Sequence, residues 1–223
     1  VRTPTSGWRI RAWFEHASSD DVAPVALPSE VRSPIPVHRL YRYSHVGFDV
    51  RHYARINQVS RANLRLLGGG WIAGDPLPIQ QRLAMGGPGI LPGHGFRSQT
   101  CAPASLTDPS QTGLCDRFLA AQAEVRFRIP LSLRDVLGAQ EWLLLDRLLG
   151  GDLADLVLFG DAGKAWLTGD GPGRVPTNRI PTFSEWAYDV GLGIDLGGLA
   201  VFVAQPVNGP GGARLTLRFQ RRF

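Results

Sequence analysis

The chain has 223 residues, a formal net charge of +5 and 43% hydrophobic residues, enough for one large domain. No apolar run approaches the roughly 20 residues that a membrane-spanning helix needs, which excludes a helical membrane protein. Lys164 is the only lysine among the 24 basic residues, and the arginines alternate with apolar residues instead of clustering. We therefore expect no nucleic-acid binding.

Eight segments alternate apolar with polar residues, which is the period-two pattern of β-strands. Val125, for example, stands between Glu124 and Arg126. The expected strands cover residues 7–16, 41–56, 59–71, 118–129, 154–167, 185–196, 199–206 and 213–223. The pattern predicts an all-β, antiparallel protein in which one face of each strand is apolar.

The last of these segments ends the chain on an aromatic residue. Leu217, Phe219 and Phe223 fall on one side of an extended chain, and Arg218 falls on the other. Bacterial outer-membrane barrels commonly end in such a strand, because the last strand must pair with the first to leave no open edge in lipid. This segment favours a transmembrane antiparallel β-barrel with about eight visible strands.

The connections between the expected strands alternate in length. Long loops occupy 17–40, 72–117 and 168–184, with a shorter one at 206–212, whereas the turns near Asn57 and at Gly197-Gly198 are tight. Outer-membrane barrels have long external loops and short periplasmic turns. The connection 130–153 breaks this rule, since it is long and holds a possible helix over 139–149.

A soluble antiparallel sheet with one wet face is the alternative for any single strand. Across the set, the polar face mixes arginines with Asp and Glu, as a water-filled lumen would. The apolar face carries aromatic residues near strand ends, where a bilayer interface favours them. These aromatic residues are Trp8, Trp166, Trp186 and Tyr188.

The two cysteines, Cys101 and Cys115, flank a polar segment. In an exported protein such a pair favours a disulfide over free thiols. A zinc site needs about four ligands, and no nearby Cys or His pair completes one. His38, His45 and His52 recur at odd spacing, which places neighbours on opposite faces of a strand, so a shared metal is not expected.

Catalytic patterns are weak. The chain has no G-x-S-x-G motif, and Gly160 to Lys164 lacks the spacing and the hydroxyl of a phosphate-binding loop. Asp189 and Asp195 share a face but lie about 20 Å apart along a strand, too far for paired acid–base chemistry. We interpret both as solvated lumenal groups, and we expect neither an enzyme nor a cofactor.

Several motifs resemble the BamA/TamA family of outer-membrane assembly barrels. The segment from Gly86-Gly87 to His94-Gly95-Phe96 resembles the family's signature loop, which pairs Gly-Gly with a downstream Val-Arg-Gly-Phe/Tyr. Residues 156–166, with Phe159, Asp161 and Gly163, resemble its Phe-x-Asp-x-Gly strand. Residues 188–193, 204–206 and the terminal Phe223 are similar to its closing strands. These motifs follow one another in the same order as in the family, and together they cover about residues 75–223.

The resemblance implies roles for these residues. In the family the loop folds into the lumen, and its Arg contacts the Asp of the next motif. Here that Asp is Asp161, and His94 stands at the Arg position, which is a departure from the family pattern. An imidazole can hydrogen-bond to a carboxylate but lacks the guanidinium fork. Arg97 is a second candidate for this contact.

The family barrel has sixteen strands, so residues 1–223 form either half of such a barrel or a small eight-stranded one. Eight strands leave little room for a folded-in loop, which favours the half-barrel. The resemblance implies a non-enzymatic protein of the bacterial outer membrane that assists insertion or translocation of other outer-membrane proteins. Its expected partners are the lipid bilayer, nascent outer-membrane proteins and periplasmic assembly factors. Phe219 and Phe223 would belong to the C-terminal seam and recognition signal.

Two rival functions fit the same pattern. One is a passive or secretion pore of the same fold. The other is a membrane anchor for a module that lies outside this sequence.

Overall fold

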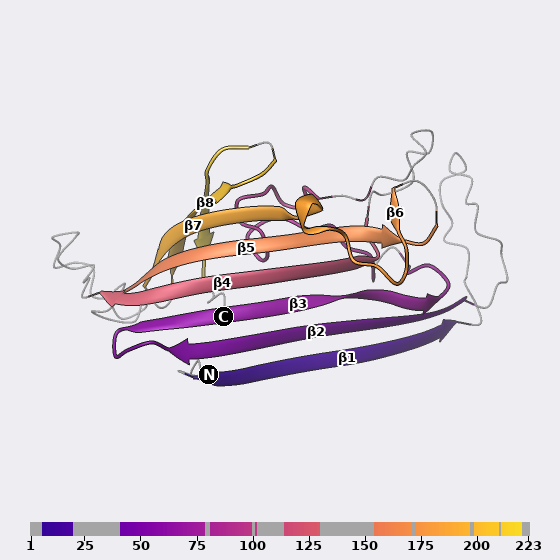
Figure 1. The fold of residues 1–223 in the computed structure, drawn as a ribbon, viewed down its shortest axis with the longest axis horizontal. Helices are drawn as coiled ribbons and strands as arrows, with labels where there is room; N and C mark the ends of the chain where they lie inside the picture. The colour runs from indigo at the N-terminus through magenta and orange to yellow at the C-terminus, as the bar shows by residue number, and fades with distance from the viewer. Residues whose placement is uncertain are drawn as a thin grey trace.

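The computed structural model describes residues 6–19, 41–78, 81–99, 101, 114–129, 154–170, 173–196, 199–209 and 211–219. These residues form nine strands and one 3-10 turn, Phe183–Glu185 (Figure 1). The strands are β1 (Gly7–Ser19), β2 (Tyr41–Arg55), β3 (Ser60–Gly74), β4 (Arg117–Ile129), β5 (Ala154–Thr168), β6 (Arg174–Val175), β7 (Ala187–Asp195), β8 (Ala200–Pro206) and β9 (Arg214–Arg218).

The long strands form one antiparallel sheet in the order β1-β2-β3-β4-β5-β7-β8-β9. Each of the eight predicted segments overlaps one of these strands, so the all-β, antiparallel prediction is confirmed. The tight turn predicted near Asn57 joins β2 to β3, where Ser60 O accepts the N–H of Ile56 at 3.0 Å. The two-residue β6, which pairs in parallel with the end of β5, was not predicted.

Four sequence predictions differ from the structure or lie beyond it. The C-terminal strand ends at Arg218, so Phe219 follows the strand instead of belonging to it. Phe223 and the turn at Gly197-Gly198 lie outside the described residues. The helix expected over 139–149 does so as well.

One face of the sheet is apolar from β1 to β9, and we call it the apolar face. In register across the sheet, Leu158 lies beside Leu192, which lies beside Val203, which lies beside Leu215. These side chains are exposed, and Leu192 keeps 54% of its surface accessible. Other exposed members of this face are Trp8, Ile10, Phe14, Leu64, Leu66, Phe127, Val190 and Leu217.

The opposite face is polar and buried, and we call it the polar face. Arg126 is only 2% exposed. Other buried members are Asn63, Gln122, Glu124, Asp161, Asp189, Asp195 and Thr216. Soluble proteins bury apolar side chains and expose charged ones, so this sheet has the reverse arrangement.

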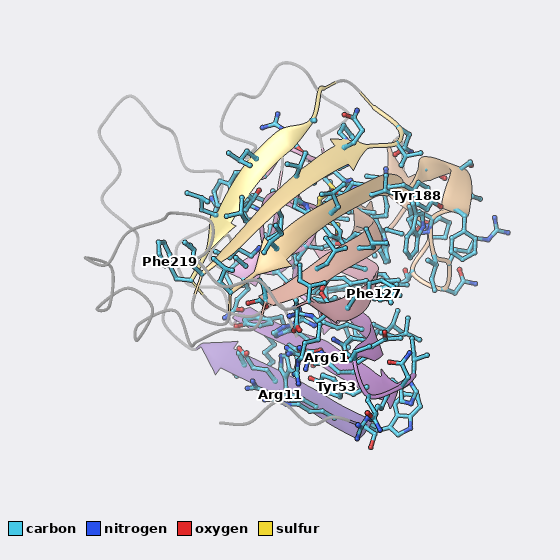
Figure 2. The ribbon with its side chains drawn as sticks, turned by 90° about the vertical axis from the view of Figure 1, so that its left-hand side faces the viewer. Arg11, Tyr53, Arg61, Phe127, Tyr188 and Phe219 are labelled. Atoms are coloured by element: carbon cyan, nitrogen blue, oxygen red, sulfur yellow. A yellow bond between two sulfur atoms is a disulfide. The ribbon has the colours of Figure 1, made fainter. Side chains whose placement is uncertain are left out.

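Among the described residues, β1 pairs only with β2 and β9 only with β8, so the sheet is not closed into a barrel. Figure 2 shows it as a curved wall, with Arg61 from the polar face and Phe127 and Tyr188 from the apolar face labelled. Within the part of the chain that the structure describes, no helix is long and apolar enough to cross a bilayer.

The aromatic residues near the strand ends differ in part from the prediction. Trp8 is exposed on the apolar face, but Trp166 and Trp186 are buried. Trp186 Nε1 donates to Pro181 O at 3.2 Å. Residues of the β5–β7 connection therefore contact this end of the sheet, and the exposed aromatic residue there is Phe183.

Candidate functional site

Ion pairs connect four strands across the polar face. Arg126 on β4 donates to Glu124 Oε1 and to Asp195 Oδ2, each at 2.5 Å. Asn63 Nδ2 on β3 donates to the same Glu124 oxygen at 2.7 Å. Arg61 on β3 donates to Asp155 Oδ2 on β5 at 2.6 Å. Because Arg126, Glu124 and Asp195 are buried, each of these charges depends on its partner in place of water.

A second network reaches from β2 to a loop. Asp49 accepts hydrogen bonds from both Arg51 and Arg65, at 2.8 and 2.7 Å for the shorter contacts. Arg65 Nη1 also donates to Gln122 Oε1 at 3.2 Å, and Gln122 Nε2 donates to Ile90 O at 3.0 Å. The backbone carbonyl of Ile90 belongs to the predicted signature loop, so this loop lies on the polar face.

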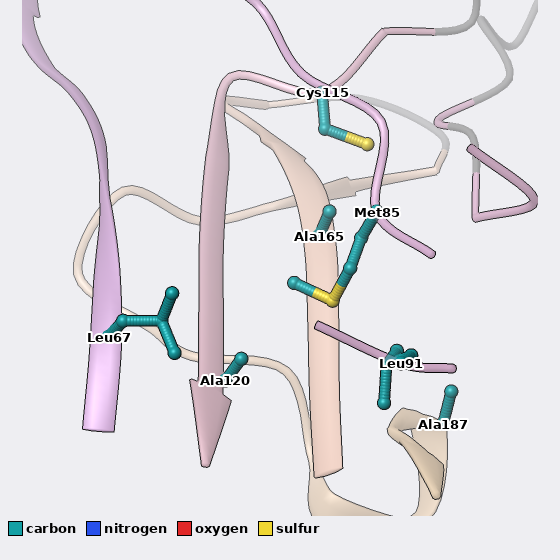
Figure 3. Close-up of a cluster of buried hydrophobic side chains, with 7 residues drawn as sticks. All are labelled: Leu67, Met85, Leu91, Cys115, Ala120, Ala165 and Ala187. Carbon is teal, nitrogen blue, oxygen red and sulfur yellow. The ribbon is translucent and has the colours of Figure 1, made fainter. Parts of the chain in front are cut away.

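Apolar side chains of the loop pack onto a patch of small wall residues. Met85 and Leu91 are almost completely buried, and they belong to one cluster with Leu67, Cys115, Ala120, Ala165 and Ala187 (Figure 3). A Cβ built on Gly163 would lie 2.7 Å from Met85 Sδ, so the thioether covers that glycine. This apolar patch interrupts the charged surface of the polar face, and the loop packs against it.

The loop has a defined backbone. Met85 and Gln99 exchange backbone hydrogen bonds at 3.1 and 2.8 Å. Gly86 and Gly87 both have positive φ, which favours glycine. A Cβ on Gly86 would also lie 2.5 Å from Gly95 O. Gly-Gly is therefore needed where the two ends of the loop approach each other.

The tip of the loop is bound to β7. The backbone N–H of Gly93 donates to Asp189 Oδ2 at 2.6 Å, in a buried contact. His94 Nε2 lies 3.4 Å from Tyr188 O, at the long limit of a hydrogen bond. The loop thus contacts two successive residues of β7, one by its backbone and one by a side chain.

Asp161 lies between the two wall residues that hold the loop. In register, Gln122 on β4 faces Asp161 on β5, which faces Asp189 on β7. Asp161 is 4% exposed. Its predicted contact with His94 stays a prediction, because the contact described for the His94 ring leads to Tyr188.

The other predicted loop residues lie nearer the solvent. Phe96 is exposed, and the guanidinium of Arg97 lies 5.3 Å from its ring centroid. A Cβ on Gly95 would lie 3.5 Å from an Arg214 nitrogen, so Gly95 approaches β9. Arg97 is the one described non-glycine residue with positive φ, at 53°.

The cysteine pair and the C-terminal aromatic residue lie at the margins of this site. Cys101 and Cys115 form a disulfide with a Cα–Cα distance of 5.2 Å. Leu83 and Cys115 also exchange backbone hydrogen bonds at 3.0 and 2.6 Å, which holds the loop against the start of β4. Phe219 is 79% exposed.

Two sequence interpretations need correction. Asp189 and Asp195 are not solvated, because both are buried and engaged, by Gly93 and Arg126 respectively. Sequence reasoning also missed Gln122 and Leu91 as loop contacts. The period-two pattern placed Gln122 and Asp189 on the polar face, but it carries no information about which of them lie side by side.

His45 and His52 lie on opposite faces of β2, as their spacing predicted. His52 on the apolar face stacks on Trp8 with ring centroids 4.2 Å apart, whereas His45 on the polar face lies 3.4 Å from Glu15. His38 lies outside the described residues. In the described segments, no group of three or more His, Cys, Asp or Glu side chains could hold a metal ion.

The structure thus defines an all-β protein with an exposed apolar face and a buried polar face covered by a loop. No protein-family model matches the chain, and no curated protein matches it.

Proposed function

We propose that this chain is part of an outer-membrane barrel that assists insertion or translocation of other outer-membrane proteins, as BamA/TamA-type barrels do. The observation that carries the proposal is the reversed sheet. Leu192 and its neighbours on the apolar face are exposed, while Arg126 and Glu124 are buried. Lipid would cover the apolar side chains, and the polar face would line the lumen.

The strand lengths support a membrane position. A transmembrane strand needs roughly 9–11 residues. Strands β1 to β5 have 13 to 15 residues and β7 has nine. Strands β8 and β9 are shorter, with seven and five residues. The last two strands would therefore span only part of the apolar layer unless a partner strand extends them.

The charges at the two open edges favour a barrel with further strands. The polar face of β1 carries Arg9 and Arg11, and that of β9 carries Arg214 and Arg218. Direct pairing of β1 with β9 would bring guanidinium groups together, and like charges on facing strands are destabilising. We therefore infer that other strands lie between these edges, so that the described sheet forms about half of the wall.

The packed loop supports the assembly function over a simple pore. A loop that packs across the polar face would fill part of the lumen and obstruct passive flow. An open edge such as β9 would let an incoming strand pair by β-augmentation. The exposed Leu215, Leu217 and Phe219 would lie on the lipid side of that seam.

The membrane position is tested by a charge on the apolar face. Leu192→Arg should cost roughly 2–4 kcal/mol if residue 192 lies near the bilayer midplane, and Leu192→Ala should cost less. The readout is urea unfolding in liposomes, followed by tryptophan fluorescence. A soluble protein would tolerate Arg at a half-exposed position, and it would stay monomeric without detergent. Either result would overturn the membrane proposal.

The assembly function needs a separate assay. Liposomes that contain the full-length protein should accelerate the folding of an added, unfolded outer-membrane barrel protein, relative to empty liposomes. Heat-modifiable migration on a gel reports the folded client. A protein that conducts ions in planar bilayers but leaves client folding unchanged would favour the pore.

A further inference from the structure

The contact between Gly93 and Asp189 is the deepest polar link between the loop and the sheet. Asp189 is fully buried, and its carboxylate accepts the Gly93 N–H at 2.6 Å. A hydrogen bond to a charged acceptor is roughly twice as strong as a neutral one. In a site that excludes water, its loss is not replaced by solvent.

The fit around Gly93 allows no side chain. A Cβ at this position would lie 2.7 Å from Asp189 Cβ and 2.9 Å from Pro206 N. The loop backbone is therefore in contact with β7 and with the end of β8. By contrast, a Cβ on Gly89, in the same loop, would meet nothing within 4 Å.

The two polar anchors of the loop come from strands on either side of β5. Gln122 on β4 holds the carbonyl of Ile90, and Asp189 on β7 holds the N–H of Gly93. Residues 91–94 form a turn, in which the His94 N–H donates to Leu91 O at 3.1 Å. The two side chains therefore hold this turn from both sides of β5, which carries Asp161.

We propose that Asp189 is the positioning residue that holds the loop in the lumen, acting through the backbone N–H of Gly93. This role rests on the proposed function, since it assumes that the polar face lines a lumen. It is distinct from the role of Asp161 implied by the family motif, because Asp189 lies on the next strand and binds backbone instead of the side chain at position 94. Loss of the Asp189 carboxylate frees the loop tip while the sheet stays folded.

The test measures how often the loop leaves the wall. Leu91 is fully buried under the loop, so a Leu91→Cys reporter reacts with a charged thiol reagent only when the loop lifts. The native cysteines are joined in a disulfide and stay silent. All variants carry this reporter in the full-length protein in detergent micelles. Heat-modifiable migration and circular dichroism verify that each one is folded.

Two changes should release the loop by different routes. Asp189→Ala removes the acceptor, and Gly93→Ala keeps the carboxylate but forces the backbone away from it. Each should raise the labelling rate by roughly ten- to a hundredfold, as expected for loss of a buried charge-assisted hydrogen bond. Asp189→Asn keeps an acceptor oxygen and should restore most of the protection. Asp189→Leu keeps the bulk without an acceptor and should label as fast as Asp189→Ala, whereas a role limited to packing would leave it protected.

Two control substitutions make similar chemical changes at positions that do not form the Gly93–Asp189 contact. Gly89→Ala adds the same methyl group to the loop in open space. Asp155→Asn removes a polar-face carboxylate that pairs with Arg61. Both should label at the parent rate. The proposal is overturned if Asp189→Ala is folded and labels no faster than the parent, or if Asp155→Asn is accelerated equally.

Failure of the positioning role and failure of the assembly function give different results. If the protein does not accelerate client folding but Asp189→Ala labels clearly faster than the parent, the assembly function is overturned and the positioning role stands. If client folding is accelerated but Asp189→Ala and the parent label at the same rate, only the positioning role is overturned. If both Asp189→Ala and Gly93→Ala fail to fold while Gly89→Ala folds, the contact holds the sheet instead of the loop, and the proposal is wrong.

Discussion

Each buried charge in the Arg126 network on the polar face is compensated by a partner of opposite charge. Arg126 lies between two carboxylates, Glu124 and Asp195, at 2.5 Å from each. Removal of one member of a buried pair leaves the others without compensation, which costs about 3–5 kcal/mol. Arg126→Met should therefore destabilise the fold by this amount, measured by urea unfolding in micelles.

Arg128 provides the matched control for that prediction. It lies two residues along the same strand, with a half-exposed side chain 3.9 Å from Asp155 Oδ1. Exposed ion pairs contribute about 0–1 kcal/mol, so Arg128→Met should be close to neutral. Equal losses of unfolding free energy from the two substitutions would show that the buried network contributes no more stability than a surface ion pair.

Glycines on the polar face make room for aromatic rings of the neighbouring strand. A Cβ on Gly191 would lie 2.3 Å from Phe159 Cζ and 2.4 Å from Val203 O. Gly191→Ala should therefore cost about 1–3 kcal/mol through overpacking. Gly212→Ala, which meets nothing within 4 Å, should leave the unfolding midpoint unchanged. A tolerated Gly191→Ala would mean that Phe159 repacks freely.

At the scale of elements, the disulfide joins the far end of the loop to the start of β4. It closes a loop with a sequence separation of 14 residues, for which chain entropy predicts about 3 kcal/mol of stabilisation. Cys101→Ala with Cys115→Ala should lower the unfolding free energy by up to that amount. Reductant should destabilise the parent protein to the same level and leave the double variant unaffected.

The strands themselves were predictable because their signal is local. Period-two alternation located all eight long strands, including β4 with its Glu124 and Arg126, since each strand needs only its own residues to define two faces. The end of β9 at Arg218 was not predictable, because where pairing stops depends on the length of β8. The burial of Trp186 depends likewise on a connection that folds back over it.

At the scale of the whole molecule, the two open edges of the sheet lead to a prediction about the number of strands in the barrel. If β1 paired directly with β9, Ile10 and Leu217 would lie near each other on the apolar face. A short bismaleimide should therefore cross-link Ile10→Cys with Val50→Cys, which are register partners on β1 and β2, but not Ile10→Cys with Leu217→Cys. Efficient cross-linking of the second pair would indicate an eight-stranded barrel.

The sequence by itself determined the strands, their two faces and the pairing of the only two cysteines, because alternation and residue count are properties of the chain alone. It also indicated the loop from Gly86 to Phe96 as a site. Only the tertiary structure decided that Gln122, Asp161 and Asp189 form one row, and that Asp189 receives the loop. The physical reason is register: a slip of two residues keeps every side chain on its face but changes every neighbour.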